Sequence, residues 1–275
     1  MAQAAAEAEL MDGRTVQLAL SALAVECRVV RALMLREIHS LYGDARLGYL
    51  WALIQTSISI IIFWAMRKFM GTPSPHGMSV AMFLISGFFV WNVISYVIIK
   101  SLTAVEANAS LLYFPQVTEL DVFVARAGVV YVTEVVVCMI MVGAAFMLGE
   151  DVRVHSWGTV IAVLIFLPLL ALGLGLTLDA CAVLCPVLSR LVPFVIRGLF
   201  FISGVFFSAT FFARDVAELL LYNPVFQLIE LLRHGIYLSY PAYHCSWLYL
   251  TAVTVCLLAL GAVMERYVRT RRISR

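Results

Sequence analysis

The sequence predicts an all-α polytopic membrane protein with six transmembrane helices. It also predicts an N-terminal amphipathic helix at the membrane interface and two short re-entrant helices before the last span. Composition indicates the class: 63% of the 275 residues are hydrophobic, 13% are charged, and the mean hydropathy is +0.97. Soluble domains are about half apolar and about a quarter charged, so this composition excludes them. The length of the apolar segments gives the number of spans.

Six apolar segments have the length of membrane spans, because a helix needs about 20 residues to cross the hydrocarbon core. Their predicted bounds are 50–66, 79–99, 122–148, 157–178, 188–212 and 246–264. The whole chain, 1–275, is predicted to form one transmembrane domain. Its first five spans lie within 50–212, and a basic tail occupies 265–275.

Residues 14–41 are predicted to form an amphipathic helix that lies in the membrane plane. One face is polar and carries Arg14, Gln17, Ser21, Arg28 and Arg31. Apolar residues fill the opposite face, and arginines on the polar face suit anionic lipid headgroups. The alternative is a soluble helix packed on a partner, but the span that follows soon afterwards favours the interface.

The connection 100–121 is predicted to contain a short helix. Thr103 and Glu106 have the spacing of a capping box, in which two side chains satisfy free N–H groups of the first helical turn. Pro115 disfavours a helical conformation in the residue before it, so the helix is expected to end near Tyr113.

The stretch 203–240 is apolar enough for a membrane but too interrupted to cross one. Asn223-Pro224 divides it into two helical pieces, because proline cannot continue a helix from the preceding turn. Glu230 and Arg233 are three residues apart on one helix face, so they can pair with each other or contact the transported molecule. We favour local pairing.

The positive charges predict that both ends of the chain lie in the cytoplasm. In that orientation 14 of the 19 Lys and Arg residues are on the cytoplasmic side, as the positive-inside rule expects. If 216–238 crossed the membrane, the basic tail would move outside. This segment is therefore expected to enter and leave on the outer side.

Two charged residues are predicted to lie inside the membrane, Glu134 in the third span and Arg197 in the fifth. Each lies about 10–12 Å deep at 1.5 Å per residue. Ionisable groups at such depth usually face a partner or a wet cavity. One hypothesis is that they pair or flank a hydrated path for an anionic substrate; we favour the alternative, an ion pair that only holds helices together.

The sequence predicts a protein that is not an enzyme. It contains no G-x-x-x-x-G-K-[ST] and no HExxH motif, and its histidines are dispersed. Cys181 and Cys185 share a helix face, but no further ligand completes a metal site. We therefore expect no metal, no bound cofactor and no nucleic acid, and uphill transport would need energy from a partner.

Three groups of residues resemble one family. The first comprises LREI at 35–38, YG at 42–43 and LGYLW at 47–51. The second comprises YFP at 113–115, Val117 and LD at 120–121. The third comprises SGVFFS at 203–208, Asn223-Pro224, Glu230, Arg233 and Gly235. In this order and spacing they resemble the permease subunit of type-2 ABC exporters, most closely the KpsM-type permeases of capsular polysaccharide export. Gln55-Thr56 departs from the proline expected early in the first span.

The resemblance implies a homodimer that works with two separate P-loop ATPase subunits of the KpsT type, which bind ATP and Mg²⁺. It implies a Gram-negative inner membrane and a lipid-linked capsular polysaccharide as substrate. It also implies a periplasmic co-polymerase-type protein (KpsE-type) and an outer-membrane exporter as partners, in addition to the membrane lipids.

The resemblance also implies roles for particular residues. A coupling helix near 103–113 would dock on the ATPase through Thr103, Glu106, Asn108, Ser110, Leu111 and Leu112. Periplasmic gate helices in 213–240 would include Tyr222, Asn223, Pro224, Glu230 and Arg233. The cytoplasmic face would present Arg28, Arg31, Arg36 and Arg46.

A sugar chain needs a wide, wet path with aromatic and polar walls, for which the sequence offers several side chains. The candidates are Glu134, Arg197, Trp64, Tyr96, Phe206 and Phe207, with Phe200 and Phe201 beside them. The alternative for each aromatic residue is ordinary packing or contact with lipid.

Two other classes of function stay open at this point. Within the same superfamily the cargo could be O-antigen, teichoic acid or a small drug, which sequence separates poorly. An ATP-independent channel or a membrane scaffold would lack an ATPase partner. A membrane-embedded transferase is disfavoured because the chain has no plausible acid/base cluster.

Overall fold

The computed structural model of the chain describes residues 25–38, 48–69, 71, 75–114, 116–150, 152–241 and 245–273. Every regular element in these ranges is a helix, which confirms the predicted all-α class. Among these described residues, four helices are long and apolar enough to cross a membrane. They are α3 (Val80–Ser101), α5 (Glu119–Met147), α6 (Trp157–Leu184) and α10 (Trp247–Ile273).

Two further helices correspond to the first and fifth predicted spans. The first is α2 (Gly48–Phe69), which contains a shorter apolar section at Ile54–Arg67. The other is α7 (Val187–Ile202), whose 16 residues reach about 24 Å. The predicted bounds 188–212 are wrong beyond residue 202. Gly204 takes φ +85°, which ends the helical path, and a 3-10 turn, η3 (Ala209–Phe211), follows.

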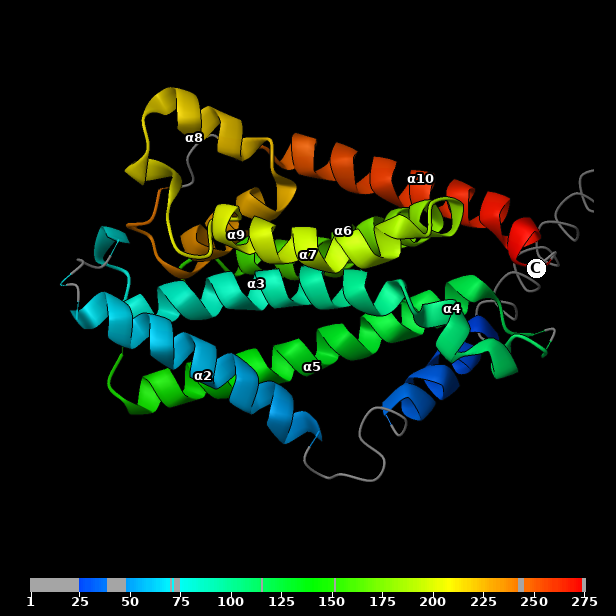
Figure 1. The fold of residues 1–275 in the computed structure, drawn as a ribbon. Helices are drawn as coiled ribbons and strands as arrows, with labels where there is room; N and C mark the ends of the chain where they lie inside the picture. The colour runs from blue at the N-terminus through cyan, green and yellow to red at the C-terminus, as the bar shows by residue number, and fades with distance from the viewer. Residues whose placement is uncertain are drawn as a thin grey trace, which may run out of the picture.

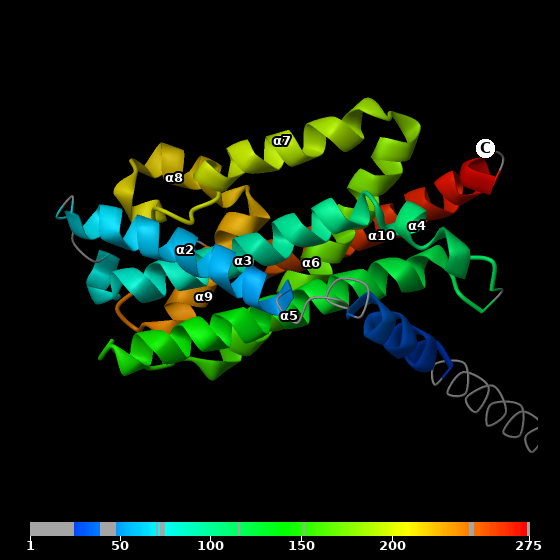
Figure 2. The ribbon, with the colours of Figure 1, turned by 60° about the horizontal axis from the view of Figure 1, so that its bottom comes forward.

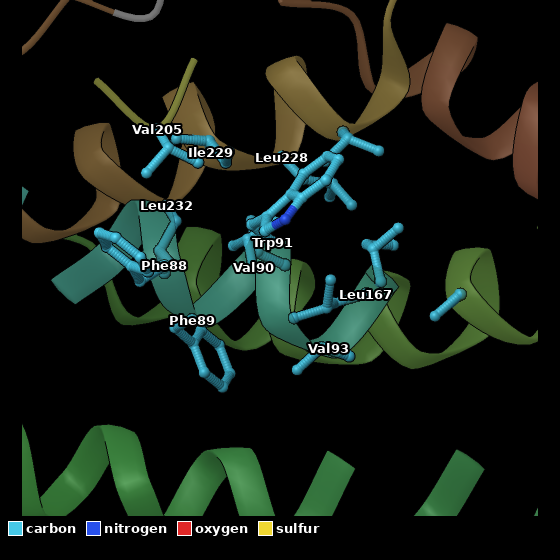
Figure 3. Close-up of a cluster of buried hydrophobic side chains, with 14 of the residues drawn as sticks. Phe88, Phe89, Val90, Trp91, Val93, Leu167, Val205, Leu228, Ile229 and Leu232 are labelled. Carbon is cyan, nitrogen blue, oxygen red and sulfur yellow. The ribbon is translucent and has the colours of Figure 1, made fainter. Parts of the chain in front are cut away.

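Helix α3 forms the centre of the molecule, with α2, α5, α6 and α9 (Pro224–Ile236) packed around it (Figure 1). Its buried apolar side chains meet those of α9, with Leu167 of α6 and Val205 beside them (Figure 3). In a membrane, close packing drives helix association, because lipid tails are as apolar as the side chains they replace. A buried central helix therefore fixes the positions of its neighbours.

Helices α6 and α10 approach closely through glycine. A Cβ added at Gly173 would lie 3.0 Å from the main-chain N of Leu258, and one at Gly261 would lie 2.8 Å from Cβ of Leu176. Small residues at such contacts are typical of helix pairs in membranes. Helix α10 also continues to Ile273, so most of the predicted basic tail at 265–275 is helical.

The elements separate into two ends of the bundle (Figures 1 and 2). One end, which we call the α4 end, holds α4 (Ala104–Ala107), η2 (Ala109–Leu111), the helix at 25–38 and the C-terminal end of α10. The other, the α8 end, holds the turn η1 (Pro75–Gly77) and α8 (Arg214–Leu221). Figure 2 shows α7 along one edge of the molecule.

The predicted amphipathic helix is described only at 25–38. There Arg28 and Arg31 are exposed, whereas Leu33 is buried against Ala104 of α4 and Phe123 of α5. The remainder of 14–41 lies outside the described residues. The position of this helix in the membrane plane stays a prediction.

The predicted capping box at Thr103 and the helix to Tyr113 are wrong. The side chain of Thr103 does not cap, because its hydroxyl donates to the main-chain O of Lys100 (3.4 Å) and accepts from Arg126 (3.3 Å). The chain forms two short pieces, α4 and η2, in place of one helix. A capping box instead starts α5, where Thr118 and Asp121 satisfy each other's main-chain N–H groups.

Candidate functional site

The α4 end presents a short projecting element made of α4 and η2. Beyond it, Tyr113 and Phe114 are 87% and 61% exposed. Among the predicted coupling residues, Thr103, Glu106 and Ser110 are exposed, Leu111 and Leu112 are half-buried, and Asn108 is buried. The element therefore offers a mixed polar and apolar surface at one end of the bundle.

Two hollows border this element. One has a volume of about 460 Å³ and includes Glu106, Asp179 and Ser189 in its lining. The other, of about 330 Å³, includes Tyr113, Glu119 and Arg269. Both also include Val105 and Ala109, so both border α4 and η2. A partner side chain can enter either hollow next to this element.

An ion pair and a hydrogen bond join the helix at 25–38 to this end. Nε of Arg126 lies 2.8 Å from Oε1 of Glu37, with both side chains about nine-tenths buried. Nη1 of Arg36 donates to Oδ1 of Asn108 at 3.2 Å. These contacts give the LREI segment a structural role that its sequence alone did not define.

Arg126 also binds the chain between α3 and α4. Its Nη1 donates to the main-chain O of Lys100 (3.0 Å) and to Oγ1 of Thr103 (3.3 Å). In the sequence, Arg126 was one of the 14 basic residues predicted to lie on the cytoplasmic side, with no further role. The sequence held one signal for this contact. Arg126 is a basic residue near the start of a predicted span, and Glu37 is an acidic residue in the segment before the first span.

Arg233 forms a second network at the α8 end and is fully buried. Its guanidinium donates to four main-chain oxygens, those of Phe83 (3.1 Å), Gly204 (2.8 Å), Val205 (2.9 Å) and Phe207 (3.2 Å). It also donates to Oγ of Ser86 at 3.4 Å and stacks over the ring of Phe83, 3.5 Å from its centroid. One side chain of α9 thus holds the start of α3 and the loop after α7.

Glu230 is the anionic partner in this network. Its Oε1 lies 3.4 Å from Nη1 of Arg233, so the predicted local pairing of Glu230 and Arg233 is confirmed. The hydroxyl of Tyr240 donates to the same carboxylate at 2.5 Å, and Ser208 and the main-chain N–H of Ala209 donate to its second oxygen. Burial raises the pKa of Glu230, whereas Arg233 and these donors oppose the rise.

The break between α8 and α9 is confirmed at Asn223-Pro224. The Asn223 side chain accepts from the main-chain N of Val225 at 3.0 Å, and Pro224 takes the first helical position. Tyr222, beside the break, is 73% exposed. Whether the two helices dip into the outer leaflet stays a prediction.

A profile of the ABC-2 type transporter family matches residues 28–237, a range that contains Arg126 and Arg233 with the residues that each of them contacts. This chain belongs to the ABC-2 type transporter family. It is a multi-pass permease related to proteins of capsule polysaccharide export.

Three relatives of the ABC-2 chain illustrate that similarity. The polysialic acid transport protein KpsM of Escherichia coli is 27% identical over 249 residues, which cover 90% of this chain and 96% of that protein. The capsule polysaccharide export inner-membrane protein CtrC of Neisseria meningitidis is 27% identical over 260 residues, or 90% and 94% of the two chains. BexB of Haemophilus influenzae, with the same description, is 24% identical over 247 residues, or 89% and 92%.

Glu134 and Arg197, the two charges predicted to lie inside the membrane, do not form an ion pair with each other in this structure of the ABC-2 chain. Glu134 is 2% exposed and accepts from Nδ2 of Asn92 at 3.3 Å, while Arg197 lies exposed on α7. Nδ2 of Asn92 also donates to Oγ1 of Thr56 at 3.2 Å. The departure at Gln55-Thr56 thus supplies a hydroxyl to a polar contact between α2, α3 and α5.

The aromatic candidates for the path pack between helices in the ABC-2 chain. The ring of Phe206 lies 4.3 Å from that of Phe63 and 4.9 Å from that of Phe200. The ring centroid of Phe207 lies 6.0 Å from that of Phe226 of α9. Trp64 and Tyr96 are half-buried against the core. These geometries support the packing alternative for Phe206 and Phe207. Arg46 lies outside the described residues.

Proposed function

We propose that this chain is the membrane-spanning subunit of an ATP-driven exporter that moves a lipid-linked capsular polysaccharide across the inner membrane. It would act as a homodimer with two separate ATPase subunits that bind ATP and Mg²⁺. The observation that carries the proposal is alignment over about 90% of the chain with proteins named for capsule polysaccharide transport or export.

The α4–η2 element would dock on the ATPase. The exposed Tyr113 and Phe114 that follow the element, and the two hollows that border it, support this role. Burying a large aromatic side chain at an interface is among the strongest contributions to binding. Nucleotide-driven movement of the ATPase would then reach the bundle through α4.

The α4 end would face the cytoplasm and the α8 end the periplasm. The helix at 25–38 and the end of α10 lie at the α4 end, which supports a cytoplasmic position for both termini (Figure 1). In this arrangement α2 and α7 complete six spans, and α8 and α9 would be gate helices that do not cross. Exposed Arg28 and Arg31 would then meet anionic headgroups.

The homodimer would enclose the polysaccharide path between its two subunits. Exposed apolar side chains on α2 and α7, such as Ile61, Phe194 and Phe201, support a partner surface there. A KpsE-type protein and an outer-membrane exporter would continue the route beyond the inner membrane.

Purification of the chain from native membranes tests the proposal. We expect two ATPase subunits and two permease subunits by native mass spectrometry, with a glycolipid bound. A complex without an ATPase would contradict the proposal and favour a channel or scaffold. A lipid-linked O-antigen, a teichoic acid or a small drug in place of capsular glycolipid would keep the transporter class and change the cargo.

A further inference from the structure

We infer that Arg126 is a positioning residue that makes the helix at 25–38 part of the coupling element. Displacement of α4–η2 by the ATPase would pass through Arg126 to that helix, which then acts as more than a membrane anchor. The inference rests on the proposed docking of an ATPase at α4–η2.

The guanidinium of Arg126 joins three separate segments. It contacts Glu37 in the N-terminal helix at 2.8 Å, the main-chain O of Lys100 in α3 at 3.0 Å, and Oγ1 of Thr103 before α4 at 3.3 Å. A planar fork with five fixed N–H donors suits such a junction, whereas the ammonium of lysine is a point charge on a flexible stem. Relative movement of the three segments therefore requires these bonds to change together.

A second polar contact ties the same helix to α4. The amide of Asn108 donates to the main-chain O of Ala104 at 3.0 Å and accepts from Arg36 at 3.2 Å. Asn108 joins the end of α4 to the start of η2. Arg36 thus binds the residue at which the projecting element changes direction.

Close apolar packing completes the connection. Ala104 of α4 is fully buried beside Leu33 of the N-terminal helix. A Cβ added at Gly128 of α5 would lie 3.0 Å from Cε of Met34. Because packed side chains transmit displacement with little compression, the N-terminal helix, α4 and the start of α5 should move as one unit.

The charge pair points to a role in geometry more than in stability. A buried ion pair gains little over an apolar contact of the same volume, since removing both charges from water offsets most of their attraction. Here the pair lies where the last carbonyls of α3 lead into α4, a place where its directional bonds define the angle between segments.

Hydrogen–deuterium exchange on the complete permease–ATPase complex tests the inference. In the wild type, a non-hydrolysable ATP analogue should change amide exchange in both α4 and residues 25–38. In Arg126→Lys the change in α4 should persist, while the change in residues 25–38 should fall to what the Arg36–Asn108 bond and the apolar packing still transmit. An unchanged N-terminal helix in the wild type would overturn the inference, whatever the variant does. So would a full response of that helix in the variant.

Transport measurements on the reconstituted complex give a second readout. For Arg126→Lys and Glu37→Gln we expect normal recovery of the ATPase and retained ATP hydrolysis, with polysaccharide exported per ATP reduced about tenfold. Glu26→Gln, a matched change on the exposed face of the same helix, should export normally. Parallel loss of ATPase recovery, hydrolysis and export in the two variants would show a structural role only.

A double variant separates joint action from two independent effects. Because Glu37 acts only through its contact with Arg126, the double variant should lose no more export per ATP than Arg126→Lys alone. Losses that multiply would contradict the inference. Failure of the wild-type chain to bind any ATPase would instead refute the proposed function, and the inference with it.

Discussion

Arg126 and Arg233 bind main-chain oxygens near opposite ends of the same helix. Nη1 of Arg126 donates to the O of Lys100 in the last turn of α3, and Nη2 of Arg233 donates to the O of Phe83 in its first turn. The central helix is thereby fixed to α4 and the N-terminal helix at one end, and to α9 and the loop after α7 at the other. Displacement at the α4 end thus has a rigid connection to the α8 end.

Replacing Arg233 should be among the most destabilising changes in the chain. Lysine keeps the positive charge but lacks the planar fork of donors, so Arg233→Lys leaves several buried main-chain oxygens without a donor, and each such unsatisfied group costs about 1–3 kcal/mol. We expect the apparent melting temperature in detergent to fall by about 10 °C. Glu218→Gln is the matched control, because the Arg214–Glu218 pair is exposed and should contribute less than about 1 kcal/mol. Equal melting temperatures for the two variants would show that the network does not hold the α8 end together.

Gly204→Ala should also destabilise the α8 end. Gly204 has φ +85°, and an added Cβ would lie 2.4 Å from Cδ2 of Phe226. Backbone strain and overpacking together should cost about 2–4 kcal/mol in thermal unfolding. Gly198→Ala in α7, where a Cβ meets nothing within 4 Å, should be neutral or slightly stabilising. A neutral Gly204→Ala would mean that the loop adopts another path.

The contribution of Glu134 to thermal stability should depend on its contact with Asn92 and not on Arg197. Glu134→Gln keeps an acceptor for the Asn92 amide, so thermal stability should change little, whereas Asn92→Leu leaves the buried carboxyl without its donor and should lower it by about 1–3 kcal/mol. Arg197→Gln should leave stability unchanged because Arg197 is exposed. Restored export when Glu134 and Arg197 are exchanged would contradict this view and indicate a contact between the two subunits of the proposed dimer.

Local signals explain the parts of this fold that the sequence predicted. Long apolar runs and the break at Asn223-Pro224 depend on neighbouring residues, and the pairing of Glu230 with Arg233 follows from helical spacing of three. Such patterns predict the structure correctly because the contacts that they describe form within one element and do not depend on distant segments.

Contacts between distant segments explain what the sequence did not predict. Arg126 and Glu37 are 89 residues apart in the sequence, and Arg233 and Phe83 are 150 apart. No periodic sequence pattern predicts contacts over such separations. Thr103 failed as a cap because Arg126 binds its hydroxyl. The sequence suggested the charged Arg197 as the partner of Glu134. Its partner in the structure is Asn92, a neutral residue that no sequence pattern marks as a candidate.

Cysteine labelling should separate the two ends of the bundle across the membrane. Cys27 is exposed on the N-terminal helix, and Glu218→Cys introduces a thiol on exposed α8. In intact spheroplasts of a strain that expresses the chain with Glu218→Cys and Cys185→Ser, an impermeant maleimide should label the introduced thiol on α8. It should spare Cys27 until the cells are lysed. Labelling of Cys27 from outside would reverse the proposed orientation.

Truncating the aromatic tip beyond η2 should abolish ATPase binding without unfolding the permease. Tyr113 and Phe114 are 87% and 61% exposed, so Tyr113→Ala with Phe114→Ala removes little packing, and its melting temperature should stay within about 2 °C of the wild type. At an interface the same rings would be buried, where each truncation typically costs about 2 kcal/mol or more, or about thirtyfold in affinity. Co-purification of the ATPase from membranes measures the loss, with Met147→Ala, 89% exposed on α5, as the control. Normal ATPase recovery in the double variant would place the docking surface elsewhere on the chain.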